Sequence, residues 1–221
     1  MEYAYLKKNY KLTLGVGLED LSGQYDVYNR IYNQDGPITV DYSSDMRFQQ
    51  YSMFGELVRS WWNDRLTLSM GLRADGNNYN ALMNNPFDHL SGRINMAVAL
   101  TNSLKFNLGA ANYYQLPPMM TLSYSNSGEL DNLEISQYIR SNHFTAGFRW
   151  ETKISSRLSI EGFLKKYPNY MMTLRDNISL AHQPVDFGVY GNYPVEFSSE
   201  GRAYGIEVFY QQRLFKGMHG M

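Results

Sequence analysis

Apolar and polar residues alternate along several short stretches of the chain. In residues 65–75 (RLTLSMGLRAD), every second position from Leu66 to Ala74 is apolar, and polar or small residues lie between. A period of two predicts a β-strand with one apolar and one polar face. The pattern leaves two alternatives open: the leucines face the dry core of a soluble sandwich, or they face lipid around an outer-membrane barrel.

The same alternation recurs along the chain. It is found in residues 10–19, 93–100, 104–110, 143–151, 158–165 and 203–214. The stretch 48–60 is less regular, because Phe54 and Val58 share a register with Glu56. Together these segments predict eight strands, with the end of a ninth at residues 2–6, and no stretch shows helical periodicity.

The connections between the predicted strands are alternately short and long. Short turns are expected at 7–9, 61–64, 101–103, 155–157 and 215–218, and long polar connections at about 20–46, 76–89, 114–136 and 167–200. Short turns at one end and long loops at the other are typical of a transmembrane barrel, whose strands need about ten residues to cross on a tilt. The sequence therefore favours an all-β, antiparallel transmembrane β-barrel meander of about eight strands.

The composition supports this interpretation and excludes some classes of function. Aromatic residues make up 15% of the chain, with 19 tyrosines, at a mean hydropathy of -0.45; aromatic girdles at the membrane interfaces use such residues. A formal net charge of -1 gives no basis for nucleic-acid binding. Without cysteine, disulfides and thiolate metal sites are excluded. The start of the chain lacks the apolar core of a signal peptide.

No arrangement of residues indicates an enzyme, a metal site or a cofactor. The four histidines are scattered over different segments, and neither a nucleophile elbow nor a phosphate-binding loop is found. The best candidate for ligand binding is the long loop 167–201. Its tyrosine and asparagine side chains suit ligand capture on a rigid scaffold. The candidate substrate-binding residues are Tyr170, Tyr190, Asn192 and Tyr193. The alternative is a loop that packs on itself or on its neighbours.

Several phrases of the sequence, taken in order, resemble the barrel of TonB-dependent outer-membrane receptors, particularly the Bacteroidetes type. They occupy residues 50–57, 68–75, 92–100, 108–118, 143–151, 160–170 and 199–214. Gly92-Arg93 stands where the family usually has Pro-Arg. The resemblance implies a Gram-negative outer-membrane protein that takes up a large scarce nutrient such as a siderophore, cobalamin or an oligosaccharide. Its implied partners are outer-membrane lipid, the nutrient at the extracellular loops, and TonB through a plug domain.

Such receptors have about 22 strands around a plugged lumen. Residues 1–221 would then be part of one outer-membrane β-barrel domain, an incomplete slice without the plug and the C-terminal strands. Two alternatives stay open. Eight strands are enough to close a small structural or adhesive outer-membrane barrel, and a soluble β-barrel or sandwich could bind an apolar ligand inside.

Overall fold

The chain folds into one antiparallel sheet in which each strand pairs with the next along the sequence. The computed structural model describes residues 1–33, 36–126, 128–151, 156–182 and 193–212. The strands are β1 (Glu2–Lys7), β2 (Tyr10–Asn33), β3 (Gly36–Trp61), β4 (Leu66–Asn77), β5 (Leu90–Ala99), β6 (Leu104–Gln115), β7 (Ile139–Glu151), β8 (Ser156–Thr173) and β9 (Val195–Gln212). Their order in the sheet is their order in the chain, which confirms the predicted all-β meander.

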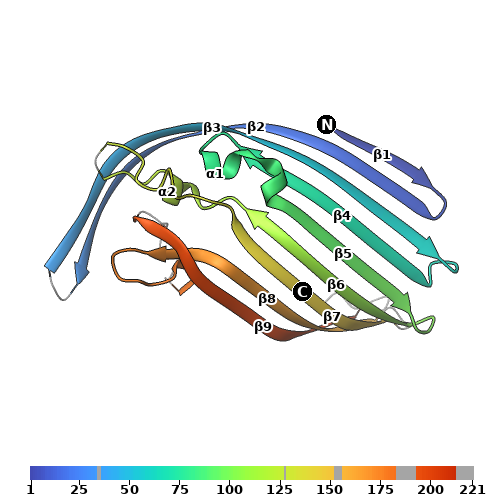
Figure 1. The fold of residues 1–221 in the computed structure, drawn as a ribbon. Helices are drawn as coiled ribbons and strands as arrows, with labels where there is room; N and C mark the ends of the chain where they lie inside the picture. The colour runs from blue at the N-terminus through green and yellow to red at the C-terminus, as the bar shows by residue number, and fades with distance from the viewer. Residues whose placement is uncertain (34–35, 127, 152–155, 183–192, 213–221) are drawn as a thin grey trace, which may run out of the picture.

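The sheet is curved, with a hollow face and a convex face (Figure 1). Within the described residues, β1 and β9 each pair with one neighbour only, so the sheet does not close on itself. The structure is thus a slice of a barrel wall, and the alternative of a small closed barrel is wrong for this chain. No helix of the described part is long and apolar enough to span a membrane.

The two faces of the sheet differ in the way the alternation predicts. Paired residues of neighbouring strands share a face, and the register lines up apolar residues in rows across the sheet. One such row contains Leu68, Met96, Leu108, Ala146, Gly162 and Ile206. Large apolar side chains of this convex face are exposed: Leu72 keeps 59% of its surface and Ile206 keeps 76%. A soluble sandwich would cover this face with a second sheet, and none is formed by the described residues.

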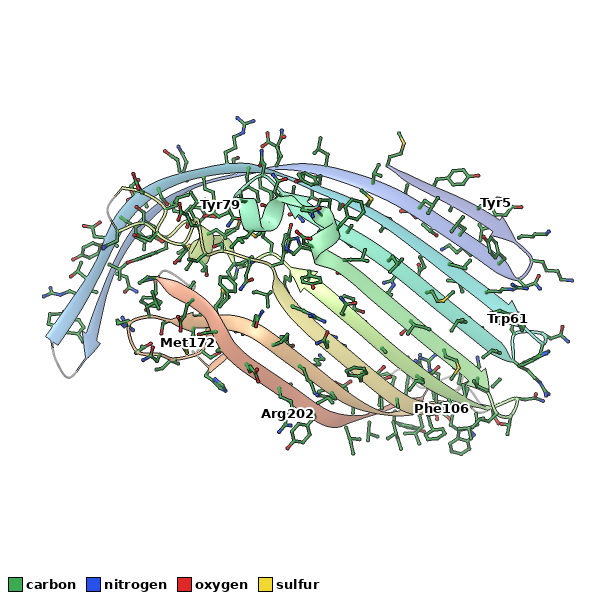
Figure 2. The ribbon with its side chains drawn as sticks, viewed as in Figure 1. Tyr5, Trp61, Tyr79, Phe106, Met172 and Arg202 are labelled. Atoms are coloured by element: carbon green, nitrogen blue, oxygen red, sulfur yellow. The ribbon has the colours of Figure 1, made fainter. Side chains whose placement is uncertain are left out.

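Aromatic residues border the convex face at the short-turn end. Trp61 lies at the end of β3 (Figure 2), where the guanidinium carbon of Arg59 is 4.9 Å from its ring centroid. The rings of Phe106 and Phe148, paired between β6 and β7, are 5.2 Å apart. These are the positions that girdle aromatics take at a membrane boundary.

Strands β2 and β3 are longer than the other strands and cover most of residues 20–46. The long connection expected there is therefore wrong. They pair from Tyr10 with Arg59 to Asn33 with Gly36, and Figure 1 shows them arching over the hollow side. On the convex face of β2 the apolar positions end at Leu18, and Asp20 is the next residue on that face. The outward side chains beyond this point are mostly polar, so the sequence predicts a loop where the structure forms strands.

Short helices in the long connections cover the hollow face at the long-loop end. They are α1 (Ala81–Asn84), η1 (Pro86–His89), α2 (Met119–Leu122) and η2 (Leu180–His182). Inward residues of β3 and residues of α1, α2 and the segment before β7 form a buried apolar cluster beneath the arch. Its members are Met46, Phe48, Met83, Leu122 and Tyr138. A second cluster lies between β7, β8, η2 and β9, formed by Ile139, Met171, Leu180 and Val195.

Candidate functional site

The candidate site is a cavity on the hollow face, just below the layer of loops. It has a volume of about 420 Å³, and β3, β4, β5 and β6 form its floor. The side chains that line it include Phe54, Glu56, Arg73, Ser91, Arg93 and Tyr113. Cations, a carboxylate and hydroxyl groups thus share one surface, which suits a polar ligand or a polar protein surface.

A glycine allows one arginine to lie flat on this floor. Arg93 of β5 pairs with Gly71 of β4, which in turn pairs with Glu56 of β3. The arginine extends over Gly71, where an added Cβ would lie 2.8 Å from its Nε. It then donates from Nη2 to Glu56 Oε1 at 2.8 Å. Ser69 donates to the same carboxylate oxygen at 3.0 Å, so Glu56 is held by two partners.

A second ion pair lies nearer the loops, on β4. Arg73 donates from Nε and Nη2 to the carboxylate of Asp75 at 2.7–2.9 Å. The Asp75 side chain is only 6% exposed, whereas that of Arg73 is 46% exposed. A buried carboxylate needs such a charge-assisted partner. Arg73 also lines the cavity, where its partly exposed guanidinium adds positive charge.

Buried polar and aromatic groups connect this wall to the loops. Asn77 Nδ2 donates to the hydroxyl of Tyr138 at 3.0 Å, and burial raises the pKa of Tyr138 to about 12. The ring of His89 lies 4.4 Å from that of Tyr138 and 5.5 Å from that of Tyr114. Burial lowers the pKa of His89, so the ring is neutral at pH 7. Its Nδ1 has no hydrogen-bond partner among the described residues.

Hydrogen bonds of two asparagines link the three long connections, which join β4 to β5, β6 to β7 and β8 to β9. Asn80 caps α1 by accepting from the backbone N–H of Met83, and its amide donates to the carbonyls of Leu133 and Ser136. Asn132 is fully buried. Its amide donates to the carbonyls of Thr121 and Tyr193, and its Oδ1 accepts from Val195 N–H at 3.1 Å. The loops therefore form one packed layer over the hollow face.

Two of the four predicted ligand-binding residues lie in the described part of this layer. Tyr170, near the end of β8, packs against the second apolar cluster, and its ring is 5.9 Å from that of Tyr167. Tyr193 is 9% exposed, with the guanidinium carbon of Arg175 4.6 Å from its ring centroid. Tyr190 and Asn192 lie outside the described residues.

The cavity residues were not among the sequence candidates. Arg73 and Arg93 occupy polar positions of alternating strands, a placement shared by every inward residue, so the pattern alone did not single them out. The sequence pattern assigns no role to His89, and the structure buries it against two tyrosines. The described residues contain no group of three or more His, Cys, Asp or Glu side chains that could hold a metal ion.

Comparisons with known proteins agree with this architecture. A family model described as "TonB dependent receptor-like, beta-barrel" matches residues 2–218. No curated protein matches the chain. Among solved structures, a ferric-catecholate import receptor, Fiu, from E. coli K12 is similar over 97% of this chain, with a TM-score of 0.64 and 10% identity. It is matched over 34% of its own length.

Two further structures match in the same way. The copper transporter OprC matches over 96% of this chain and 34% of its own, with a TM-score of 0.61 and 15% identity. The siderophore receptor PirA from Pseudomonas aeruginosa matches over 94% and 35%, with a TM-score of 0.60 and 16% identity. The chain thus spans about a third of the length of each of these proteins.

Proposed function

Because the chain belongs to the TonB-dependent receptor β-barrel family, we propose that it forms part of the wall and outer loops of a receptor that imports a nutrient across the outer membrane. The family is one of outer-membrane receptors and transporters. The observation that carries the proposal is the pairing of an exposed apolar convex face with a charged hollow face that the loops cover at one end only. The wall of a transport barrel needs both faces: an apolar outer face in contact with lipid, and a polar lumen whose outer opening is covered by loops.

The proposed cargo is large and scarce: a siderophore, cobalamin or an oligosaccharide. The similar solved structures include receptors named for a ferric catecholate and a siderophore, which supports the first of these. The order of the family-like phrases supports a receptor of the Bacteroidetes type. In the intact receptor, work would come from TonB through a plug domain that occupies the lumen.

Ligand contacts are proposed at the long-loop end, at Tyr170, Tyr190, Asn192 and Tyr193. Arg175 supports this, because buried Tyr193 holds its guanidinium over the ring while the arginine stays exposed and offers a cation to an anionic ligand. Aromatic anchors on loops held by a rigid scaffold dominate many binding surfaces. Arg73 and Arg93 on the cavity floor would meet the ligand after it passes the loops.

A ligand-binding assay on the intact receptor tests the proposal. We expect Tyr193→Ala to weaken ligand binding by at least about fivefold, since truncating an aromatic anchor costs more than about 1 kcal/mol. The matched control is Tyr5→Ala, the same change on the convex face at the short-turn end, which should leave the Kd unchanged. A Tyr193→Phe variant keeps the ring beneath Arg175 and should bind within about twofold of the wild type. Equal effects of Tyr193→Ala and Tyr5→Ala would refute the placement of the ligand.

A further inference from the structure

The hairpin of β2 and β3 extends well beyond the neighbouring strands at the long-loop end. β1 pairs with β2 only as far as Gly15, and β4 pairs with β3 only from Gln50 toward the short turn. Beyond these points the two strands pair with each other alone, to Asn33 and Gly36 (Figure 1). The hairpin is therefore a two-stranded ribbon whose two edges pair with no further strand of the described chain.

The free edge of β3 begins directly above Gln49. The backbone N–H of Gln49 donates to Asn78 Oδ1 at 2.6 Å, and its carbonyl accepts from Asn78 N–H at 3.1 Å. Alternate residues of a strand direct their N–H and C=O groups to the same side, so the odd-numbered residues above Gln49 direct theirs away from β2 as well. Within the described chain no hydrogen bond reaches these backbone groups, and about 27 Å of edge is open to another strand. The residues are Thr39, Asp41, Ser43, Asp45 and Arg47.

The inner face of the ribbon is packed, which holds this edge in extended form. Phe48 belongs to the buried cluster beneath the arch, and the ring of Tyr42 lies 5.4 Å from that of Tyr124. Ser44 donates from its hydroxyl to the carbonyl of Ser123 at 2.6 Å. A two-stranded ribbon alone in water is only marginally stable. These contacts therefore pre-form the edge and lower the entropy cost of adding a strand to it.

The outward side chains along this edge carry unpaired negative charge. Asp41 and Asp45 are four residues apart on β3, about 14 Å along the strand, and Asp26 of β2 pairs with the residue midway between them. All three carboxylates are exposed, and the ion pairs of the described residues include none of them. Arg47, the cation at the end of the edge, is already paired with Asp20 at 2.6 Å. Carboxylates at an open edge repel an acidic strand and attract a basic one.

We propose that the free edge of β3 from Thr39 to Arg47 is a docking site for an extended, basic segment of a partner protein, which adds to the sheet as a further strand. The backbone of the segment pairs with the open N–H and C=O groups and supplies affinity, while its alternate side chains supply specificity. Basic residues four apart in the segment lie beside Asp41 and Asp45. In the proposed outer-membrane placement this edge is outside the cell, so the partner is an exported or surface protein.

Binding of fluorescent peptides to the intact receptor in detergent, measured by anisotropy, tests this edge. The probe is the peptide TVKVTVKVT, whose lysines are four residues apart, and the acidic control is TVEVTVEVT. Ser43→Pro removes one N–H from the free edge. We expect it to weaken binding of the basic peptide about tenfold, since a peptide carbonyl loses its donor. The matched control is Gln24→Pro, the same change on the opposite edge of the ribbon, which should leave binding unchanged.

Two further changes test the charges and the backbone pairing separately. Asp41→Asn/Asp45→Asn keeps every N–H of the edge and should weaken binding of the basic peptide about fivefold at low ionic strength, with a smaller effect in high salt. On the wild-type receptor, N-methylation of the lysines and the central threonine of the peptide removes the donors that face β3 in antiparallel pairing, and should abolish binding. N-methylation of the valines, on the other edge of the peptide, should not.

Three outcomes would overturn the proposal. The first is equal binding of the basic and the acidic peptide, and the second is an equal effect of Ser43→Pro and Gln24→Pro. The third is dimerisation of the receptor that Ser43→Pro abolishes, which would assign the edge to a second copy of the chain.

Discussion

His89 is a buried histidine of the loop layer whose protonation is disfavoured by burial. Its ring is buried between Tyr114 and Tyr138, and burial lowers its pKa below the ordinary value of 6.5, although the nearby carboxylates Asp75 and Asp88 act in the opposite direction. Protonation would bury a positive charge and remove it from water, and this loss of hydration is unfavourable. The folded loop therefore stabilises the neutral form of the His89 ring.

The loop layer should open more readily in mild acid. The unfolded loop takes up a proton near pH 6.5, and the folded loop does so only at lower pH. The contribution of neutral His89 to the free energy of local unfolding is therefore greatest above about pH 7. It decreases as the pH drops through 6.5 toward the lower pKa of the folded loop. Hydrogen exchange of amides 78–89, corrected for intrinsic rates, should show more opening at pH 5.5 than at pH 7.5. His89→Phe keeps an aromatic ring and should abolish this difference; an unchanged pH dependence in that variant would contradict it.

Individual contacts of the candidate site were harder to predict than the strands and loops that form it. The sequence placed ligand contacts in the long loops, and the structure packs those loops over the hollow face. It did not indicate Asn132, because its partners Tyr193 and Val195 lie 61 and 63 residues away in the chain. Nor did local pattern show that Arg93 extends over Gly71, since that depends on the register of three strands. Such contacts follow from tertiary pairing and leave no periodic signal.

At the scale of elements, β2 and β3 keep the same alternation of apolar and polar residues, but the apolar face changes side along their length. Up to Leu18 the outward side chains of β2 are apolar; from Asp20 onward they are polar, while inward Leu21 and Tyr25 pack against the buried cluster. The alternation keeps its period and exchanges its faces. In the proposed outer-membrane placement, this exchange marks the level where the hairpin would leave the lipid and extend into water.

The exchange predicts a position-dependent cost for arginine on one face of β2. Leu14 lies near the middle of the apolar segment and is 47% exposed on the convex face. Leu14→Arg should destabilise the receptor in bilayers by about 2–4 kcal/mol, the cost of a cation facing lipid at mid-depth. Ser22→Arg, on the same face beyond the exchange, should cost less than about 1 kcal/mol. Urea unfolding from bilayers measures both; equal costs would contradict the boundary at residues 18–20.

Strands with an apolar outer face and a polar inner face were predictable, and their extensions were not. The segments 65–75, 93–100, 104–110 and 143–151 lie within or largely overlap β4, β5, β6 and β7. The sequence predicts a loop at 20–46 because the outward residues there are hydrophilic, whereas the structure forms paired strands. Alternation was present there with the faces reversed, and only the pairing with β3 identifies which face is inside.

On the scale of the whole molecule, the sheet is one sector of a larger wall. Its convex face exposes apolar side chains from β1 to β9, and its hollow face carries the charged floor and the loop layer. Both outer strands present unpaired edges that further strands of a complete barrel would satisfy. The proposed uptake function depends on which of these faces meets lipid.

Spin labels on β4 of the intact receptor in bilayers test that assignment most directly. Labels at positions 68 and 70, in place of Leu68 and Met70, should be accessible to oxygen and shielded from a water-soluble nickel chelate. Labels in place of Thr67 and Ser69 should show the reverse, because they face the polar hollow side. Nickel access at position 68 together with protection at position 69 would contradict the account.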